Sequence, residues 1–149
     1  MDKISVLEHN IIMLIHFIIY GLLGMIMEIF WTGIHSLISG DLNLISQTSI
    51  WMFFIYGSAV FLEPIHDKIR RKNVIFRGIT WTFLIFIIEL LCGFLLNLLI
   101  GSCPWDYKDS TVYTLNGYIR FDYFPVWFVV GLVFEKIHAF LDKGFIGLR

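Results

Sequence analysis

Two glutamates, Glu28 and Glu89, lie inside long apolar runs of this chain. Placing an ionisable side chain at the depth of a bilayer costs roughly 2.5–3.5 kcal/mol on insertion scales, so such a residue usually faces protein and usually has a function. Two interpretations stay open. Each carboxyl group is either structural, being protonated or hydrogen-bonded by neighbouring helices, or it holds a proton or a solute as part of a binding site.

Other carboxylates and histidines add a second possible chemistry. The full set runs in the order Glu28, Glu63, His66, Glu89, Glu135 and His138, which reads Glu, Glu-x-x-His, Glu, Glu-x-x-His. Di-iron four-helix bundles use this ligand pattern. Here the two Glu-x-x-His pairs fall near the ends of their apolar runs, about 10 Å or more from the other glutamates at ~1.5 Å of rise per residue. We therefore expect no metal, and we interpret both pairs as solvated cytoplasmic ends.

The remaining residues suggest no familiar catalytic machinery. The sequence has no Gly-x-Ser-x-Gly, no phosphate-binding glycine loop and no zinc-spaced cysteines, so we expect no cofactor. Cys92 lies within an apolar run and Cys103 beyond its end, which places the two thiols too far apart to form a disulfide. His16 and Trp81 are interpreted as packing or interfacial residues. The chain is not assigned as an enzyme on these grounds.

Composition indicates the solvent that surrounds these residues. The chain has 149 residues, of which 58% are hydrophobic and 15% charged, and its mean hydropathy is +0.78. A soluble domain is typically about 45–50% apolar and roughly 25% charged. The excess apolar surface predicts contact with a lipid bilayer. No basic tract with interleaved aromatic residues occurs, which argues against nucleic-acid binding.

Four apolar segments, residues 11–38, 50–65, 79–100 and 125–141, predict an all-α integral membrane protein. We expect one transmembrane domain over residues 1–149, with the four helices packed as a bundle. Pro64 is expected in the last turn of the second span, and Pro125 in the first turn of the fourth.

Basic residues predict the orientation of these spans in the cell membrane. One side carries nine of them, Lys3, Lys68, Arg70, Arg71, Lys72, Arg77, Lys136, Lys143 and Arg149, and the other only Lys108 and Arg120. Cytoplasmic loops are enriched in lysine and arginine, so both termini are expected in the cytoplasm.

The two halves of the chain share a pattern. The second apolar segment ends in Glu-x-Ile-His at residues 63–66, and the fourth repeats it at residues 135–138. This predicts a tandem-duplicated helical hairpin, with the copies related by a pseudo-two-fold axis along the membrane normal. Glu28 and Glu89 would then be equivalent residues that face each other across the axis. Glycines such as Gly24 would allow close helix approach.

The long connection between the third and fourth spans, residues 101–123, is rich in aromatic residues. Asn116-Gly117 between apolar-rich segments predicts a short β-hairpin or re-entrant cap on the outer side. Arg120 either pairs with Asp106 or neutralises one of the intramembrane glutamates. The candidate ligand-binding residues are Glu28, Glu89, Trp105, Asp106, Tyr107, Asn116 and Arg120.

Several of these motifs together carry a family resemblance. They are Gly24-x-x-x-Glu28, Phe54-Ile55-Tyr56-Gly57, Glu89 with Gly93-Phe94, Cys103-Pro104-Trp105-Asp106-Tyr107, Asn116-Gly117-x-Ile119, and Trp127 with Gly131. The chain resembles the transmembrane protein 229 family and the bacterial CmpB-like family labelled putative ABC-transporter type IV. The resemblance implies a small multi-spanning membrane protein with a transporter label. No nucleotide-binding domain is recognisable, so an ATPase would be a separate partner.

Three functions follow as hypotheses. The first is a transporter, or transporter subunit, that binds a small polar or cationic solute at the intramembrane carboxylates. Four spans are few for a transport path, so we expect a homo-oligomer or a partner membrane subunit. The second is a membrane-embedded enzyme acting on a lipid at the outer face, with Glu89 or Asp106 as general base and Arg120 holding an anionic headgroup. The third is a structural or assembly subunit.

Overall fold

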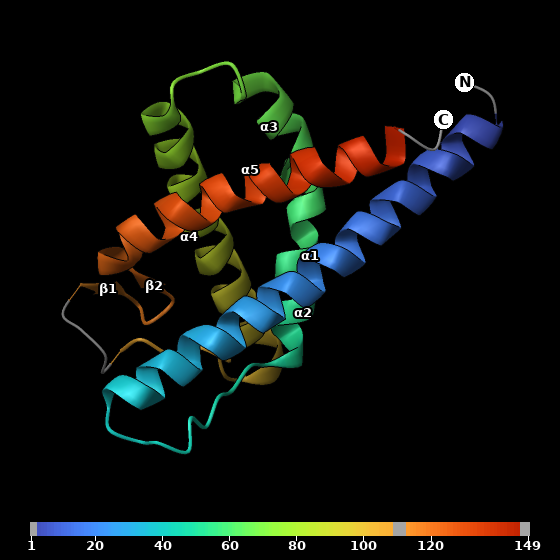
Figure 1. Ribbon diagram of the computed structural model, residues 1–149. Helices are drawn as coiled ribbons and strands as arrows, with labels where there is room; N and C mark the ends of the chain where they lie inside the picture. Colours follow the sequence, from blue (N-terminus) through green and yellow to red (C-terminus); the bar gives the residue numbers. More distant parts are fainter. Residues whose placement is uncertain (1–2, 109–112, 147–149) are drawn as a thin grey trace. The chain divides into compact units, whose positions relative to one another are not determined.

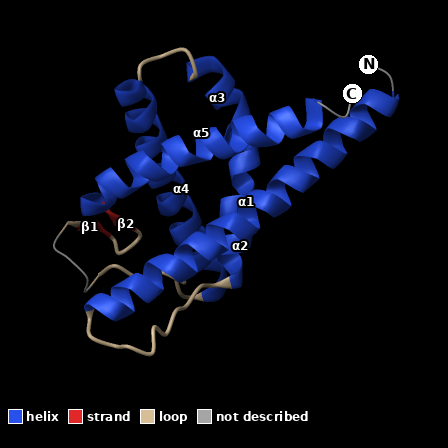
Figure 2. Ribbon diagram, viewed as in Figure 1, coloured by secondary structure: helices blue, strands red, loops and turns tan. Residues whose placement is uncertain are grey.

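The computed structural model describes residues 3–108 and 113–146, and these residues are almost entirely helical (Figure 1, Figure 2). The α-helices are α1 (Lys3–Ile38), α2 (Ile50–Gly57), α3 (Glu63–Ile69), α4 (Val74–Ile100) and α5 (Phe124–Ile146). The shorter elements are the 3₁₀ helices η1 (Ser58–Leu62) and η2 (Phe121–Tyr123) and the strands β1 (Thr114–Leu115) and β2 (Ile119–Arg120). The all-α prediction is confirmed.

The chain divides into two compact units, Met1–Pro64 and Ile65–Arg149. In the first unit, α1 packs against α2 and η1. In the second unit, α4 packs against α5, and the end of the β1–β2 ribbon contacts α4. Glu28 and Glu89 therefore lie in different units, each beside the second apolar segment of its own unit.

Three helical segments are long and apolar enough to cross a membrane: Leu7–Ile38, Val74–Ile100 and Phe121–Gly144. Large apolar side chains cover the outside of these segments, as Phe83, Leu91 and Leu98 do along α4. The inner positions of α4 hold both apolar and polar residues, among them Trp81, Phe86 and the fully buried Thr82. An apolar outer surface of this extent fits contact with lipid.

The second predicted span is the part of the fold that differs most from the expectation. It forms three consecutive short helices, α2, η1 and α3, none of which is long enough to cross a bilayer alone. Ser58 donates its hydroxyl to the carbonyl oxygen of Ile55 at 2.6 Å where α2 gives way to the 3₁₀ turn. Pro64 lies in the first turn of α3, where its missing N–H is tolerated. Placing Pro64 in a last turn was therefore wrong, because the helical path continues to Ile69.

The boundaries of α4 and α5 follow from local chemistry. The Asn73 side-chain oxygen accepts a hydrogen bond from the Phe76 N–H at 2.8 Å, so α4 begins earlier than the apolar run. The helix ends at Gly101, whose φ of 76° is the left-handed conformation typical of a glycine after a helix. Pro125 lies in the first turn of α5, as predicted.

Close helix contacts occur at glycines in both units. A Cβ atom on Gly24 of α1 would overlap the ring of Tyr56 on α2, and a Cβ on Gly131 of α5 would overlap Trp81 on α4. Small residues let neighbouring backbones approach closely, which is a main source of packing energy between helices in lipid. The expected packing role of Gly24 is confirmed.

The predicted hairpin is present in the connection between α4 and α5. Strands β1 and β2 are antiparallel, with Leu115 paired to Ile119. Asn116 and Gly117 between them have φ values of 53° and 76°, the two left-handed residues of a type I′ turn. Val112 and the three residues before it, which include Asp109, lie outside the described residues.

Candidate functional site

Glu28 is held by one neutral donor. It lies on α1 and is half-buried. The hydroxyl of Thr48 donates to its Oε2 at 2.7 Å from the segment that leads into α2. Ser49, the next residue, caps α2 by accepting a hydrogen bond from the Trp51 N–H at 3.3 Å. The start of α2 therefore positions the donor of Glu28.

Glu89, in the second unit, also accepts a hydrogen bond from a neutral donor. It lies half-buried on α4, and the indole N–H of Trp127 on α5 donates to its Oε2 at 3.2 Å. Among the side chains that the structure describes, no lysine, arginine or histidine lies within ion-pairing distance of Glu28 or Glu89. A negative charge on either residue would therefore lack a compensating charge from this part of the chain.

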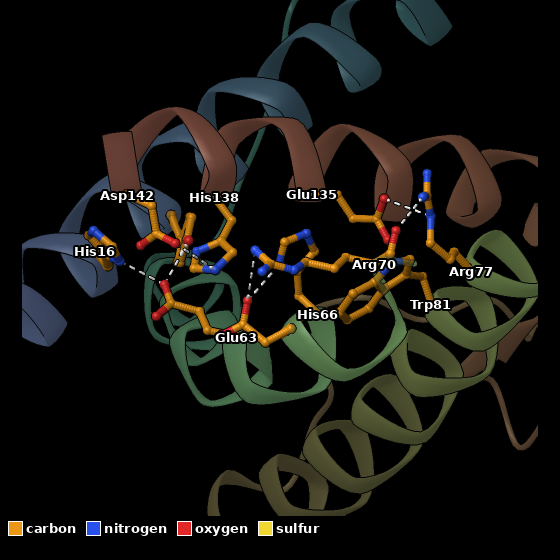
Figure 3. Close-up of polar contacts among 11 residues, drawn as sticks. His16, Glu63, His66, Arg70, Arg77, Trp81, Glu135, His138 and Asp142 are labelled. Atoms are coloured by element: carbon orange, nitrogen blue, oxygen red, sulfur yellow. Dashed lines mark hydrogen bonds and ion pairs between the residues drawn. The ribbon is translucent and has the colours of Figure 1, made fainter. Parts of the chain in front are cut away.

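Glu63 shows a different arrangement within the first unit. The Nδ1 atom of His16 on α1 lies 2.7 Å from Glu63 Oε1, and the hydroxyl of Tyr20 donates to the same oxygen at 2.8 Å. His16 is 1% exposed, so this is an interior contact of α1 with the start of α3 (Figure 3). A titratable nitrogen and a hydroxyl group thus both contact this carboxylate.

Glu135 is bound in the same manner in the second unit, as Figure 3 shows. Trp81 on α4 donates its indole N–H to Glu135 Oε1 at 2.7 Å. Arg77, one helical turn earlier, places Nε 3.1 Å from Glu135 Oε2. Both oxygens of this buried carboxylate therefore have a partner on α4, and one partner is a permanent cation.

These contacts correct the interpretation of the Glu-x-x-His pairs as solvated ends. Glu135, His66 and His138 are only 6%, 7% and 2% exposed. The rings of His66 and His138 pack edge to face with centroids 4.7 Å apart. The interpretation was wrong because it counted position along each helix and could not see which neighbouring helix faced these side chains.

The residues that contact Glu63 and Glu135 have the same spacing on α1 and α4. His16 and Tyr20 precede Glu28 by twelve and eight residues, and Arg77 and Trp81 precede Glu89 by the same intervals. Residues four apart lie on one helix face, so both members of each pair can reach one carboxylate. Sequence reasoning assigned His16 and Trp81 to packing and missed this spacing, which was visible in the sequence.

The loop between α4 and α5 is connected to Glu89 by aromatic contacts. Trp105 donates its indole N–H to the Tyr118 carbonyl at 3.1 Å, and the Tyr107 N–H donates to the Gly117 carbonyl at 3.0 Å. Hydrogen bonds thus join the Trp105–Tyr107 segment to the β-turn. Tyr107 then packs edge to face on Tyr123 at 5.8 Å, and Tyr123 on Trp127 at 6.1 Å. This aromatic row ends at the donor of Glu89.

Arg120 does not take either partner expected for it. Its Nε donates to Asp122 Oδ1 and its Nη2 to Asp122 Oδ2, both at 2.9 Å, and its guanidinium lies 4.4 Å from the Tyr123 ring centroid. The hydrogen bonds to Asp122 raise the pKa of Arg120. Asp106 instead lies 3.4 Å from Lys108 Nζ. Asp122 pairs with Arg120, and Lys108 with Asp106, because each partner is only two residues away and little chain entropy is lost in bringing it close.

The predicted ligand-binding residues thus fall into two groups in the second unit, with Glu28 apart from both in the first unit. Glu89, Tyr107 and Arg120 belong to one connected set in the second unit, joined through Tyr123 and Trp127. Trp105, Asp106 and Asn116 lie around the β-turn of the same unit. Glu28 lies in the first unit and belongs to neither of these groups.

Comparison with known families decides the classification of this helical membrane protein. The family described as "Putative ABC-transporter type IV" matches residues 15–147 of the chain. The chain belongs to this family. The type IV match begins within α1, ends at the end of α5 and covers both compact units. No solved structure matches the chain.

Proposed function

We propose that this member of the ABC-transporter type IV family is a transport protein or transport subunit that binds a small cationic or polar solute at Glu89, with Glu28 as its counterpart. The proposal rests on a difference in the partners of four glutamates. Glu63 and Glu135 contact a histidine and an arginine, whereas Glu28 and Glu89 contact neutral donors. A solute with positive charge would supply the compensation that the second pair lacks.

The aromatic row gives the proposed site its outer cover. Tyr107, Tyr123 and Trp127 run from the loop to Glu89. Aromatic faces attract cations, which suits a positively charged solute that approaches from this side. Movement of the Trp105–Tyr107 segment would then change access to the carboxylate.

The internal repeat is part of the same proposal. In both units a pair of donors four residues apart binds the glutamate of a Glu-x-Ile-His segment, and a second glutamate follows eight residues after the later donor. Chance similarity does not readily produce the same contacts and the same spacing. We infer that the two units derive from one duplicated helical hairpin and form one transmembrane domain, which fits the family match to both.

We also propose four spans with both termini in the cytoplasm. The segment from Ile50 to Ile69 has eight α-helical, five 3₁₀ and seven α-helical residues. At ~1.5 and ~2.0 Å of rise per residue these give about 32 Å, which matches a hydrocarbon core of about 30 Å. The exposed Arg70, Arg71 and Lys72 that follow support the cytoplasmic side for this end.

We also propose that this chain functions together with other subunits. Four spans leave little protein to line a transport path, so we propose a homo-oligomer, or a separate membrane or ATPase subunit. The lipid-enzyme hypothesis is less favoured, because Asp122 already occupies the guanidinium of Arg120 that would hold a headgroup. An assembly role would predict that neutral replacement of Glu89 has no effect on solute binding.

The deciding experiment is a thermal-shift screen of the purified full-length protein with alkali, ammonium, quaternary-amine and polyamine chlorides. We expect at least one cation to stabilise the wild type and to lose that effect in Glu89→Gln. Glu8→Gln serves as the control, because Glu8 is an exposed carboxylate of α1. Equal shifts in wild type and Glu89→Gln would reject the proposal.

A further inference from the structure

Two buried histidines of the second unit lie beside each other, well separated along the chain from Glu89. His66 is on α3 and His138 is on α5, and Figure 3 shows their rings turned toward one another. The ring centroids are 4.7 Å apart. The residues are 7% and 2% exposed. Imidazole is the commonest protein ligand of transition metals, so such a pair merits attention as a site.

Two carboxylates stand at the outer edge of this pair. Asp67 Oδ1 lies 3.5 Å from His66 Nδ1, and Asp142 Oδ2 lies 3.6 Å from His138 Nε2. Asp142 follows His138 by four residues, so both side chains project from one face of α5. The carboxylates are 57% and 46% exposed. The two imidazoles therefore form the buried side of the cluster, and the two carboxylates form its solvent-exposed, or wet, side.

The spacing of the donor atoms fits a single small ion. One ligand atom each from His66, Asp67 and His138 lie within 4.8 Å of one another. Tetrahedral ligands at ~2.0–2.1 Å from zinc are about 3.3 Å apart, so the ligand atoms would have to move closer together by up to about 1.5 Å when an ion binds. The wet side gives an ion a route to the histidines without crossing apolar protein.

We propose that His66, Asp67 and His138 bind one divalent transition-metal ion of the zinc type, and that Asp142, which lies beside His138 Nε2 but outside that set, moves in as a fourth ligand. Mixed nitrogen and oxygen donors suit zinc and its neighbours, whereas magnesium and calcium prefer oxygen ligands alone. This replaces our expectation from sequence that the chain binds no metal. It also differs from the four-glutamate pattern considered there, because neither Glu28 nor Glu89 takes part.

The ion would join α3 to α5. Those two helices lie at opposite ends of the second unit's sequence, with α4 and the β1–β2 ribbon between them. Arg70 now lies 3.9 Å from Asp67, where both side chains are exposed, and this weak pair would open when the carboxylate turns to the metal. Metal binding would therefore stabilise the contact of α3 with α5 and free a basic side chain.

The test uses full-length protein purified in detergent through a tag without histidines and stripped with a chelator. Zinc is titrated in competition with a chromophoric chelator, and cobalt(II) binding is followed by its visible absorption bands. We expect one zinc ion per chain and a rise in Tm with zinc. His66→Gln and His138→Gln should weaken binding by more than the roughly 10–100-fold that loss of an outer-shell partner costs.

His35→Gln is the matched control, because His35 is an exposed histidine of the other unit. If either buried-histidine variant fails to fold, Asp67→Asn and Asp142→Asn keep both imidazoles and should still weaken zinc binding. Glu89→Gln should bind zinc as the wild type does, which separates this site from the proposed solute site. Wild type without stoichiometric zinc, or ligand variants that bind like His35→Gln, would overturn the proposal.

Discussion

The indole N–H of Trp81 donates to Glu135 Oε1 at 2.7 Å, and the two residues are 1% and 6% exposed. A carboxylate in such a place is costly unless its oxygens are bonded. Glu135 therefore requires α4 beside it, and the pair fixes the register of α4 against α5. Glu135 therefore has a structural role. Glu89 differs, because its donor is Trp127 and its charge has no cationic partner among the described side chains.

Replacing Trp81 by phenylalanine should remove the donor and keep most of the volume. A hydrogen bond to a charged group contributes about 1.5–3 kcal/mol, so we expect a loss of this order in the free energy of unfolding. Chemical unfolding in detergent measures it. Trp51→Phe is the control, because Trp51 lies 39% exposed on α2 and should cost little. Equal losses in both variants would mean that Trp81 acts through its bulk.

Removing Arg77 should be worse than removing both members of its pair with Glu135. Arg77→Leu leaves a buried carboxylate without its cation, and breaking such a pair typically costs about 3–5 kcal/mol. The double variant Arg77→Leu/Glu135→Gln has no charge to compensate and keeps an oxygen for Trp81. We expect it to be more stable than Arg77→Leu, as measured by a double-mutant cycle. Strictly additive losses would contradict the interaction.

Gly131→Ala tests the close contact of α4 with α5. The new methyl group would overlap Trp81, and overpacking of this kind usually costs about 1–3 kcal/mol. Gly144 of the same helix has open space around its Cβ position, so Gly144→Ala should be neutral or stabilising by up to about 1 kcal/mol. Thermal unfolding should therefore show a lower Tm for Gly131→Ala and an unchanged or higher Tm for Gly144→Ala. A Gly131→Ala protein that unfolds at the same Tm as the wild type would disprove the tight contact.

Cys103 offers a test of the orientation in the membrane. Burial raises the pKa of its thiol, so the reactive thiolate is scarcer near neutral pH than for an ordinary cysteine and increases as the pH rises. In a Cys92→Ala background, a membrane-impermeant maleimide should label Cys103 from outside intact cells, slowly at pH 7 and faster at pH 9. Arg71→Cys in a protein without other cysteines should label only after the cells are opened. The reverse pattern would invert the proposed topology.

Local sequence signals predicted a good part of this fold. The turn at Asn116-Gly117, the first-turn position of Pro125 and the close approach at Gly24 each depend on neighbours in sequence or on one side chain's absence. The break in the second apolar segment was not predicted, because a 3₁₀ turn differs from an α-turn by one hydrogen-bond step. Composition does not distinguish the two.

The site was predicted less completely, for a physical reason. Glu28 and Glu89 stand out because a charge in an apolar run is conspicuous without any knowledge of its neighbours. The partners of Glu63 and Glu135 are set by which helix face meets which, and this depends on side-chain packing between distant segments. His16 and Trp81 are ordinary residues of an apolar helix until the carboxylate they contact is known.

The order of Arg77, Trp81 and Glu135 along the chain bears on how the protein enters the membrane. A ribosome makes the two donors on α4 before it makes the acceptor on α5. When α5 leaves the insertion machinery, its acidic side chain therefore finds a ready partner already in the bilayer. His16 and Tyr20 precede Glu63 in the same way. Each half of the chain can thus supply the partners of its own acidic side chain during synthesis, before the finished protein assembles.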